Sequence, residues 1–190
     1  MKKSVVICLI SLVGLSAPAS ATSVETYTAE SRAVIKQFFG TLKGELVAAI
    51  KQGGPPNAIT VCSNKAQTIA LDLSLEKGWD IGRTSLKLRN PINAPDAWEK
   101  RVLMDFESRK AKGESPKGMD HAEIVAVGGK KAFRYMMAIP TAAKPCLACH
   151  GETVKPAVEA ALKKKYPLDK ARGYKAGDIR GAFTISFPVN

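Results

Sequence analysis

The chain has 190 residues, of which 45% are hydrophobic and 24% charged, and its formal net charge is +12 at pH 7. This length suits one globular domain with a substantial core, and the sequence contains no internal repeat and no low-complexity segment. The excess of basic residues predicts docking to an acidic partner or to an anionic lipid surface, although most of the lysines serve only to keep the protein in solution.

Residues 1–21 have the features of a secretory signal peptide. Two lysines precede the apolar run Val5–Leu15, which is too short to remain as a membrane span, and the small residues Ala19 and Ala21 supply a cleavage pattern. Cleavage would leave residues 22–190 as a single domain with a net charge of +10. We therefore expect an exported, periplasmic protein with no transmembrane segment after cleavage. Export also argues against a nucleic-acid partner.

Two amphipathic helices are predicted next. Residues 26–52 place apolar side chains every three or four positions, and the run Gly53–Pro56 ends this helix sharply. A second helix over 57–77 ends before Gly78, and its apolar stripe includes Cys62. Cys62 is therefore expected to point toward the interior.

The middle of the chain combines extended segments with one helix. Residues 80–89 are predicted to be extended, and a turn-rich loop follows them. Asp96, or the proline before it, opens a helix over 96–111. Two strands, 121–127 and 131–139, are joined around two glycines, which is a hairpin signal.

The last part of the chain contains a lysine-rich helix over 154–166, a loop over 168–179 and a strand over 180–189. Apolar side chains alternate along this strand, as expected for one that faces a core. The order of the elements predicts an α+β fold, with an antiparallel sheet flanked by helices and a long N-terminal helix.

Residues 146–150 read Cys-Leu-Ala-Cys-His, the C-x-x-C-H pattern by which haem is attached covalently. Two cysteines three positions apart can reach both vinyl groups of one porphyrin, and the histidine after them is placed to bind the iron. A zinc site would need a second pair of ligands, and outside this run the mature chain offers only one cysteine and one histidine. We therefore predict one haem c, attached through Cys146 and Cys149, with His150 as the proximal iron ligand.

The residues alone do not determine the distal ligand of that iron. Either no protein group binds there, or one of six side chains does: Cys62, His121, Met104, Met119, Met136 and Met137. Cys62 is unpaired and faces inward, but a buried cysteine is also a common apolar core residue. Met137 fits the core stripe of its strand, and His121 fits a surface position.

Four blocks of sequence carry a resemblance to a known family. They are Ala58–Ser63, Ser85–Glu99, Pro145–Gly151 and Gly173–Ala182. In these blocks the chain resembles the exported single-haem c-type cytochrome family with a PAS-like fold, formerly a domain of unknown function. The resemblance implies that His150 and Cys62 are the two axial ligands of the iron, and that the role is redox or small-molecule sensing.

We therefore predict a redox or small-ligand sensor that signals through a protein partner and is not an enzyme. The alternative is a periplasmic electron-transfer cytochrome, which the single haem and the basic surface favour, although small electron carriers of this class are all-helical. A peroxidase-like enzyme would need an acid–base residue at an open distal site. Two roles stay open for the long first helix, a contact within a homodimer or a lid over the sheet.

Overall fold

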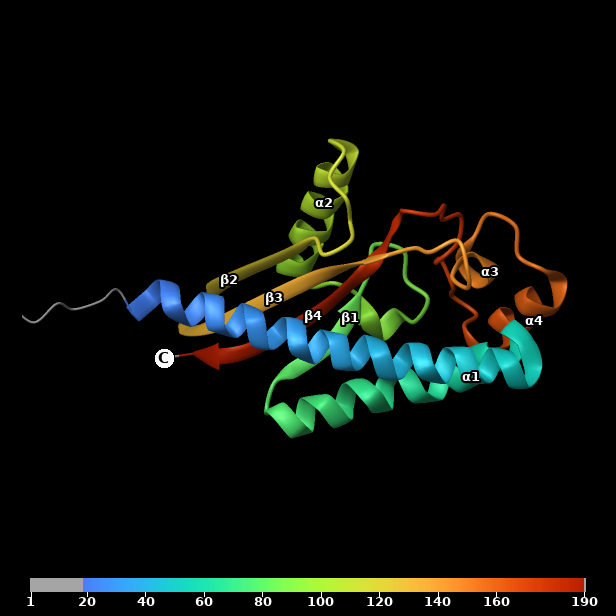
Figure 1. The fold of residues 1–190 in the computed structure, drawn as a ribbon, viewed down its shortest axis with the longest axis horizontal. Coiled ribbons are helices and arrows are strands. Elements are labelled where there is room, and N and C mark those ends of the chain that lie inside the picture. The colour runs from blue at the N-terminus through green and yellow to red at the C-terminus, as the bar shows by residue number, and fades with distance from the viewer. Residues whose placement is uncertain (1–18, 190) are drawn as a thin grey trace, which may run out of the picture.

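Residues 19–189 are described by the computed structural model, and they form a four-stranded antiparallel sheet with helices on both faces (Figure 1). The strands lie in the order β1-β4-β3-β2. They span Asp80–Thr84 (β1), Asp120–Val127 (β2), Lys130–Pro140 (β3) and Ile179–Val189 (β4). The predicted α+β class, an antiparallel sheet flanked by helices with a long N-terminal helix, is confirmed.

Residues 1–18 and Asn190 lie outside the described residues. Most of the predicted signal peptide, residues 1–21, falls in this part of the chain, so export and the 22–190 domain boundary stay predictions. Within residues 19–189, no helix combines the length and the apolar composition needed to cross a membrane.

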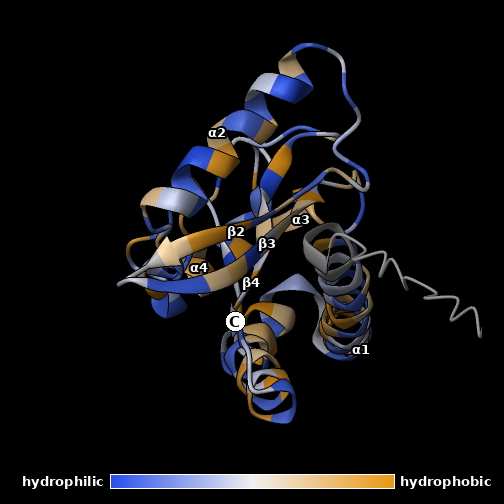
Figure 2. Cartoon of the chain, turned by 90° about the vertical axis from the view of Figure 1, so that its left-hand side faces the viewer, coloured by the Kyte–Doolittle hydropathy of each residue, from blue (hydrophilic) through white to orange (hydrophobic). Residues whose placement is uncertain are grey.

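The helix α1 spans Ala19–Lys77 and turns back on itself, so that it forms two arms (Figures 1 and 2). The turn lies at Gly53 and Gly54, whose backbone angles are not helical. Gly54 has a φ of 71°, in the left-handed region that glycine adopts readily. The two prolines that follow are tolerated because the first turn of a helix needs no N–H donors. Both predicted N-terminal helices are therefore confirmed, with the turn at the predicted place.

Both arms of α1 pack on one face of the sheet. The first arm buries Val34, Ile35 and Phe38, and the second arm buries Leu73. Their partners on the strands are mostly aromatic or branched: Ile81, Phe133, Tyr135, Phe183, Ile185 and Phe187. The alternating pattern predicted for β3 and β4 thus marks the side chains that meet α1.

The opposite face of the sheet is covered by α2 (Ala97–Ala111), which Figure 2 shows on the far side from α1. Asp96 caps this helix, and Glu99 completes a capping box, so the predicted start is confirmed. The apolar side chains of α2 are buried against the other side of the central strands. This core contains Trp98, Val102, Leu103, Phe106, Met119, Met136, Ala138, Ile179 and Ala182.

Two short helices, α3 (Leu147–His150) and α4 (Pro156–Lys165), lie toward the end of the molecule where α1 turns (Figure 1). A 3-10 turn at Pro91–Asn93 lies beside β1. An apolar cluster joins α4 to the second arm of α1: Ile59, Val158 and Leu162. Each of the four sequence blocks that carry the family resemblance contributes residues to a cavity near this end.

One predicted element is wrong over half its length. Residues 80–89 were expected to be extended, but β1 ends at Thr84. The hydroxyl of Ser85 accepts a hydrogen bond from the backbone N–H of Lys87 at 3.2 Å, which is a local turn that competes with strand pairing. The chain therefore leaves the sheet before Leu88.

Candidate functional site

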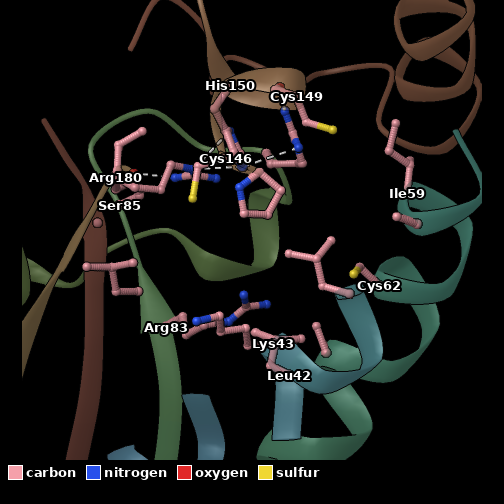
Figure 3. A pocket seen from close by; sticks show the side chains of 18 of the residues that line it. Leu42, Lys43, Ile59, Cys62, Arg83, Ser85, Cys146, Cys149, His150 and Arg180 are labelled. Atoms are coloured by element: carbon pink, nitrogen blue, oxygen red, sulfur yellow. Dashed lines mark hydrogen bonds between the residues drawn. The ribbon is translucent and has the colours of Figure 1, made fainter. Parts of the chain in front are cut away.

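A cavity of about 330 Å³ lies between the turn of α1, the β1 side of the sheet and the loop around α3. It is lined by Cys146, Cys149 and His150 from that loop and by Cys62 from the second arm of α1. In Figure 3 the three loop residues lie along one side of the cavity, and Cys62 lies on the other. The fold thus brings together the four residues predicted to hold a haem.

The walls of the cavity differ in character. Both arms of α1 contribute an apolar wall: Leu42, Leu46, Ile50, Ala58, Ile59 and Ala66. The strands and loops contribute polar and charged groups, and every charged residue of the lining is basic: Lys43, Arg83, Arg89, Lys144 and Arg180. An apolar wall beside a cationic one suits a ligand with a hydrophobic body and anionic groups.

His150 is held in one tautomer by a backbone contact. Its Nδ1 lies 2.9 Å from the carbonyl oxygen of Ala171. A carbonyl can only accept a hydrogen bond, so Nδ1 carries the proton and Nε2 the lone pair. Arg89 Nη1 and Arg180 Nε both lie 3.4 Å from this Nε2. Burial, together with the charges of Arg180 and Arg89, holds the pKa of His150 well below its ordinary value. The imidazole is therefore neutral and able to ligate a metal through Nε2.

Arg89 holds the loop that carries this histidine. Its Nη2 donates to the carbonyl oxygen of Cys149 at 2.6 Å and forms an ion pair with Asp169 at 3.2 Å. The Asp169 carboxylate is almost fully buried. Burial alone would raise the pKa of Asp169, but Arg89, the Ala171 N–H and Arg172 outweigh it and hold the pKa below its usual range. Arg89 therefore has a carboxylate partner and a structural role.

A second contact holds the same loop from the C-terminal side. The N–H of Tyr174 donates to the carbonyl oxygen of His150 at 3.0 Å, and the N–H of Gly173 donates to that of Gly151 at 3.2 Å. The ring of Tyr174 stands edge-on to the imidazole, with 6.1 Å between ring centroids. Gly173 and Tyr174, which are not part of the lining, thus support the histidine from outside the cavity.

All three cysteines of the described chain are free thiols and are partly buried. Burial raises the pKa of the Cys62 thiol, and the nearby Arg83 guanidinium opposes this shift. Burial likewise raises the pKa of Cys149. Cys62 has no disulfide partner in the described chain, so its thiol is available to a ligand in the cavity.

The other candidate distal ligands lie away from the cavity. Met119 and Met136 are buried under α2, and Met137 packs against the core beneath α1. His121 lies 3.8 Å from Glu123 and beside Trp98, on the α2 side. Met104 is 58% exposed on α2. Among the six side chains considered, Cys62 is the one that lines the cavity.

The donor set of this cavity fits the predicted haem. It offers two thiols at the spacing of a covalent attachment, a neutral imidazole, a thiol on the opposite wall and basic residues for the carboxylates of the group. The buried hydroxyl of Thr141, also in the lining, has no hydrogen-bond partner among the described residues.

Sequence reasoning missed Arg83 and Arg180 as residues of this cavity. Arg180 lies inside the Gly173–Ala182 block, which was a signal for it, but Arg83 lies outside the four blocks and no pattern pointed to it. Trp98, which does lie in a matched block, packs under α2 and has no place in the lining.

Comparisons with known proteins place the chain in a family. The model of the Tll0287-like family matches residues 17–188. The chain is also similar to a solved structure described as the crystal structure of the cyanobacterial haem protein Tll0287, with 25% identity and a TM-score of 0.66. That match covers 85% of this chain and 94% of the solved chain. No curated protein matches the chain.

Proposed function

The chain belongs to the Tll0287-like family, and we propose that it binds one haem c in the cavity between α1 and the loop around α3. The observation that carries this proposal is the convergence of Cys62 with Cys146, Cys149 and His150, which come from two distant parts of the chain. Cys146 and Cys149 would form the thioether bonds. The haem, when bound, supplies one-electron iron chemistry.

His150 and Cys62 are the axial ligands in this proposal. His150 presents an unprotonated Nε2, because its Nδ1–H donates to the carbonyl oxygen of Ala171. Arg89 donates to the carbonyl oxygen of Cys149 and so holds the loop in place. Cys62 is carried by a helix, which limits how far its thiol can move. An anionic sulfur donor favours the ferric state, so we expect a reduction potential below that of a His/Met cytochrome.

We propose that the protein acts as a redox or small-ligand sensor, in the periplasm, through a protein partner that is acidic. A cysteine ligand, which can gain a proton, makes the distal position sensitive to the state of the iron. In the described chain, no carboxylate and no second histidine lines the cavity, which supports a role other than acid–base catalysis.

The second candidate function is electron transfer. Lys144 and Ala148, on either side of Cys146, are exposed, so a partner could approach close to the attachment site. The net charge of +12 would favour an acidic redox partner. Under this candidate, Cys62 need not be a ligand.

The test is the electron paramagnetic resonance and visible spectrum of the ferric protein, compared between wild type and Cys62→Ala. We expect a low-spin thiolate signature in the wild type that is absent from the variant. His121→Ala is the matched control, since it removes a rejected candidate outside the cavity, and it should keep the signature. An unchanged spectrum in Cys62→Ala would exclude cysteine ligation and favour the electron-transfer function.

A further inference from the structure

Two of the basic residues in the cavity lack the partner that a buried charge normally has. Arg89 is paired with Asp169. The side chain of Arg83, in contrast, makes no hydrogen bond or ion pair with any residue that the structure describes, and its guanidinium lies 5.7 Å from the centre of the Phe38 ring. Figure 3 shows Arg83 on the cavity wall below the loop that carries His150.

Arg180 bonds only to neutral groups. Its Nη1 donates to the hydroxyl of Ser85 at 3.0 Å and to the carbonyl oxygen of Lys87 at 3.3 Å, and its Nε lies against the His150 ring. No carboxylate of the described chain pairs with it. Burial lowers the pKa of Arg180 to about 10, and the charges of Arg89 and Arg83 add to this shift.

Two half-buried guanidiniums without a carboxylate partner are unfavourable unless an anion pairs with them. A charge removed from water loses hydration that only a counter-charge or good hydrogen bonds can replace. No residue of opposite sign lines the cavity within the described chain. A guanidinium presents paired N–H donors that match the two oxygens of a carboxylate, and it does so better than an ammonium group. A carboxylate is therefore the anion that best fits these two arginines.

We propose that Arg83 and Arg180 form a subsite that binds the propionate carboxylates of the haem, with Ser85 orienting Arg180. This inference rests on the proposed function, because it assigns these arginines to the same cofactor. The subsite would orient the group within the cavity, with its anionic edge toward the cationic wall and its hydrophobic body against α1. Arg89 is not part of it, since Asp169 already satisfies its charge.

The test uses the full haem-loaded chain and the resonance Raman bands of propionate bending, which respond to hydrogen bonding of those carboxylates. We expect the bands to shift in Arg83→Gln and in Arg180→Gln. Lys163→Gln is the matched control, because it removes one exposed positive charge from α4 and should leave the bands unchanged. Arg83→Lys should shift them less than Arg83→Gln. Arg83→Gln is the deciding variant, since Arg180 also touches His150.

The same two arginines would also bind a free carboxylate in place of a haem propionate, and a second measurement distinguishes the two ligands. The thermal stability of the haem-free Cys146→Ser/Cys149→Ser chain is measured with and without acetate. Propionate bands that are identical in wild type and Arg83→Gln would overturn the proposal. If acetate then stabilised the haem-free chain but not its Arg83→Gln form, the arginines would be assigned to a free carboxylate. A wild-type protein purified without covalent haem would instead contradict the proposed function.

Discussion

The two faces of the sheet differ in how their charges are paired. On the α2 face, Arg134 forms ion pairs with Asp96 at 2.6 Å and with Glu99 at 3.5 Å, and its guanidinium stacks on the Trp98 ring at 4.3 Å. On the α1 face, the cavity contains Arg83 and Arg180 without a carboxylate partner. Removing one partner of a pair that the chain makes by itself destabilises the fold, whereas charges that the chain leaves unpaired indicate a ligand. The unpaired charges assign ligand binding to the α1 face, which also contains pairs of its own, Arg32 with Asp120 and Arg89 with Asp169.

The largest effect on stability is expected from a substitution in the core under α2. Phe106 is fully buried there, and Phe106→Ala should lower the free energy of unfolding by about 3–5 kcal/mol because it leaves a cavity. Chemical denaturation would measure the loss. Met104→Ala, on the exposed side of the same helix, should change stability by less than about 0.5 kcal/mol. A change in the haem spectrum of folded Phe106→Ala would break the division between the faces.

A pair of arginine substitutions tests the comparison directly. In the haem-free Cys146→Ser/Cys149→Ser chain, Arg134→Met should lower the free energy of unfolding by about 2 kcal/mol, because it leaves Asp96 and Glu99 without their partner. Arg83→Met removes an unpaired charge, so it should leave the stability of this chain unchanged or raise it. Urea denaturation of both variants would measure the difference. Equal destabilisation by the two substitutions would show that Arg83 has a structural partner after all.

The smallest effect on stability is expected from removing the Tyr135 hydroxyl, which is paired on the α1 face away from the cavity. The hydroxyl of Tyr135 donates to Asp120 at 2.7 Å, and Arg32 donates to the same carboxylate oxygen at 2.7 Å. Burial and the Asp120 carboxylate raise the pKa of Tyr135 far above its ordinary value of 10.0. Tyr135→Phe should therefore lower the free energy of unfolding by about 1 kcal/mol at pH 7.

The same substitution has a defined pH dependence. The folded state favours the neutral phenol of Tyr135. The phenol therefore contributes fully to the free energy of unfolding below pH 10.0, and this contribution declines as the pH rises toward the raised pKa of the folded state. The stability difference between wild type and Tyr135→Phe should accordingly shrink above pH 10.0, as measured by denaturation at several pH values. A difference that grew with pH would contradict the contact with Asp120.

Much of the fold could be predicted because its signals are local. The period of apolar residues in α1, the two glycines that reverse it and the Asp96 cap of α2 each act within a few residues. The strand over 80–89 was overestimated because its end depends on the Ser85 turn and on the distant Arg180, whose carbonyl oxygen accepts a bond from the Ser85 hydroxyl at 2.8 Å.

By itself, the sequence determined that Cys146, Cys149 and His150 lie on one helical turn, because their spacing sets their geometry there, and it predicted a haem attachment from that spacing. From the residues alone it left the distal ligand open among several side chains. The tertiary structure decided that Cys62 shares a cavity with His150, while His121 and the methionines do not. It also decided that Arg83 and Arg180 line this cavity without a carboxylate partner among the described residues. Both outcomes depend on long-range packing between α1, the sheet and the α3 loop, which no local pattern encodes.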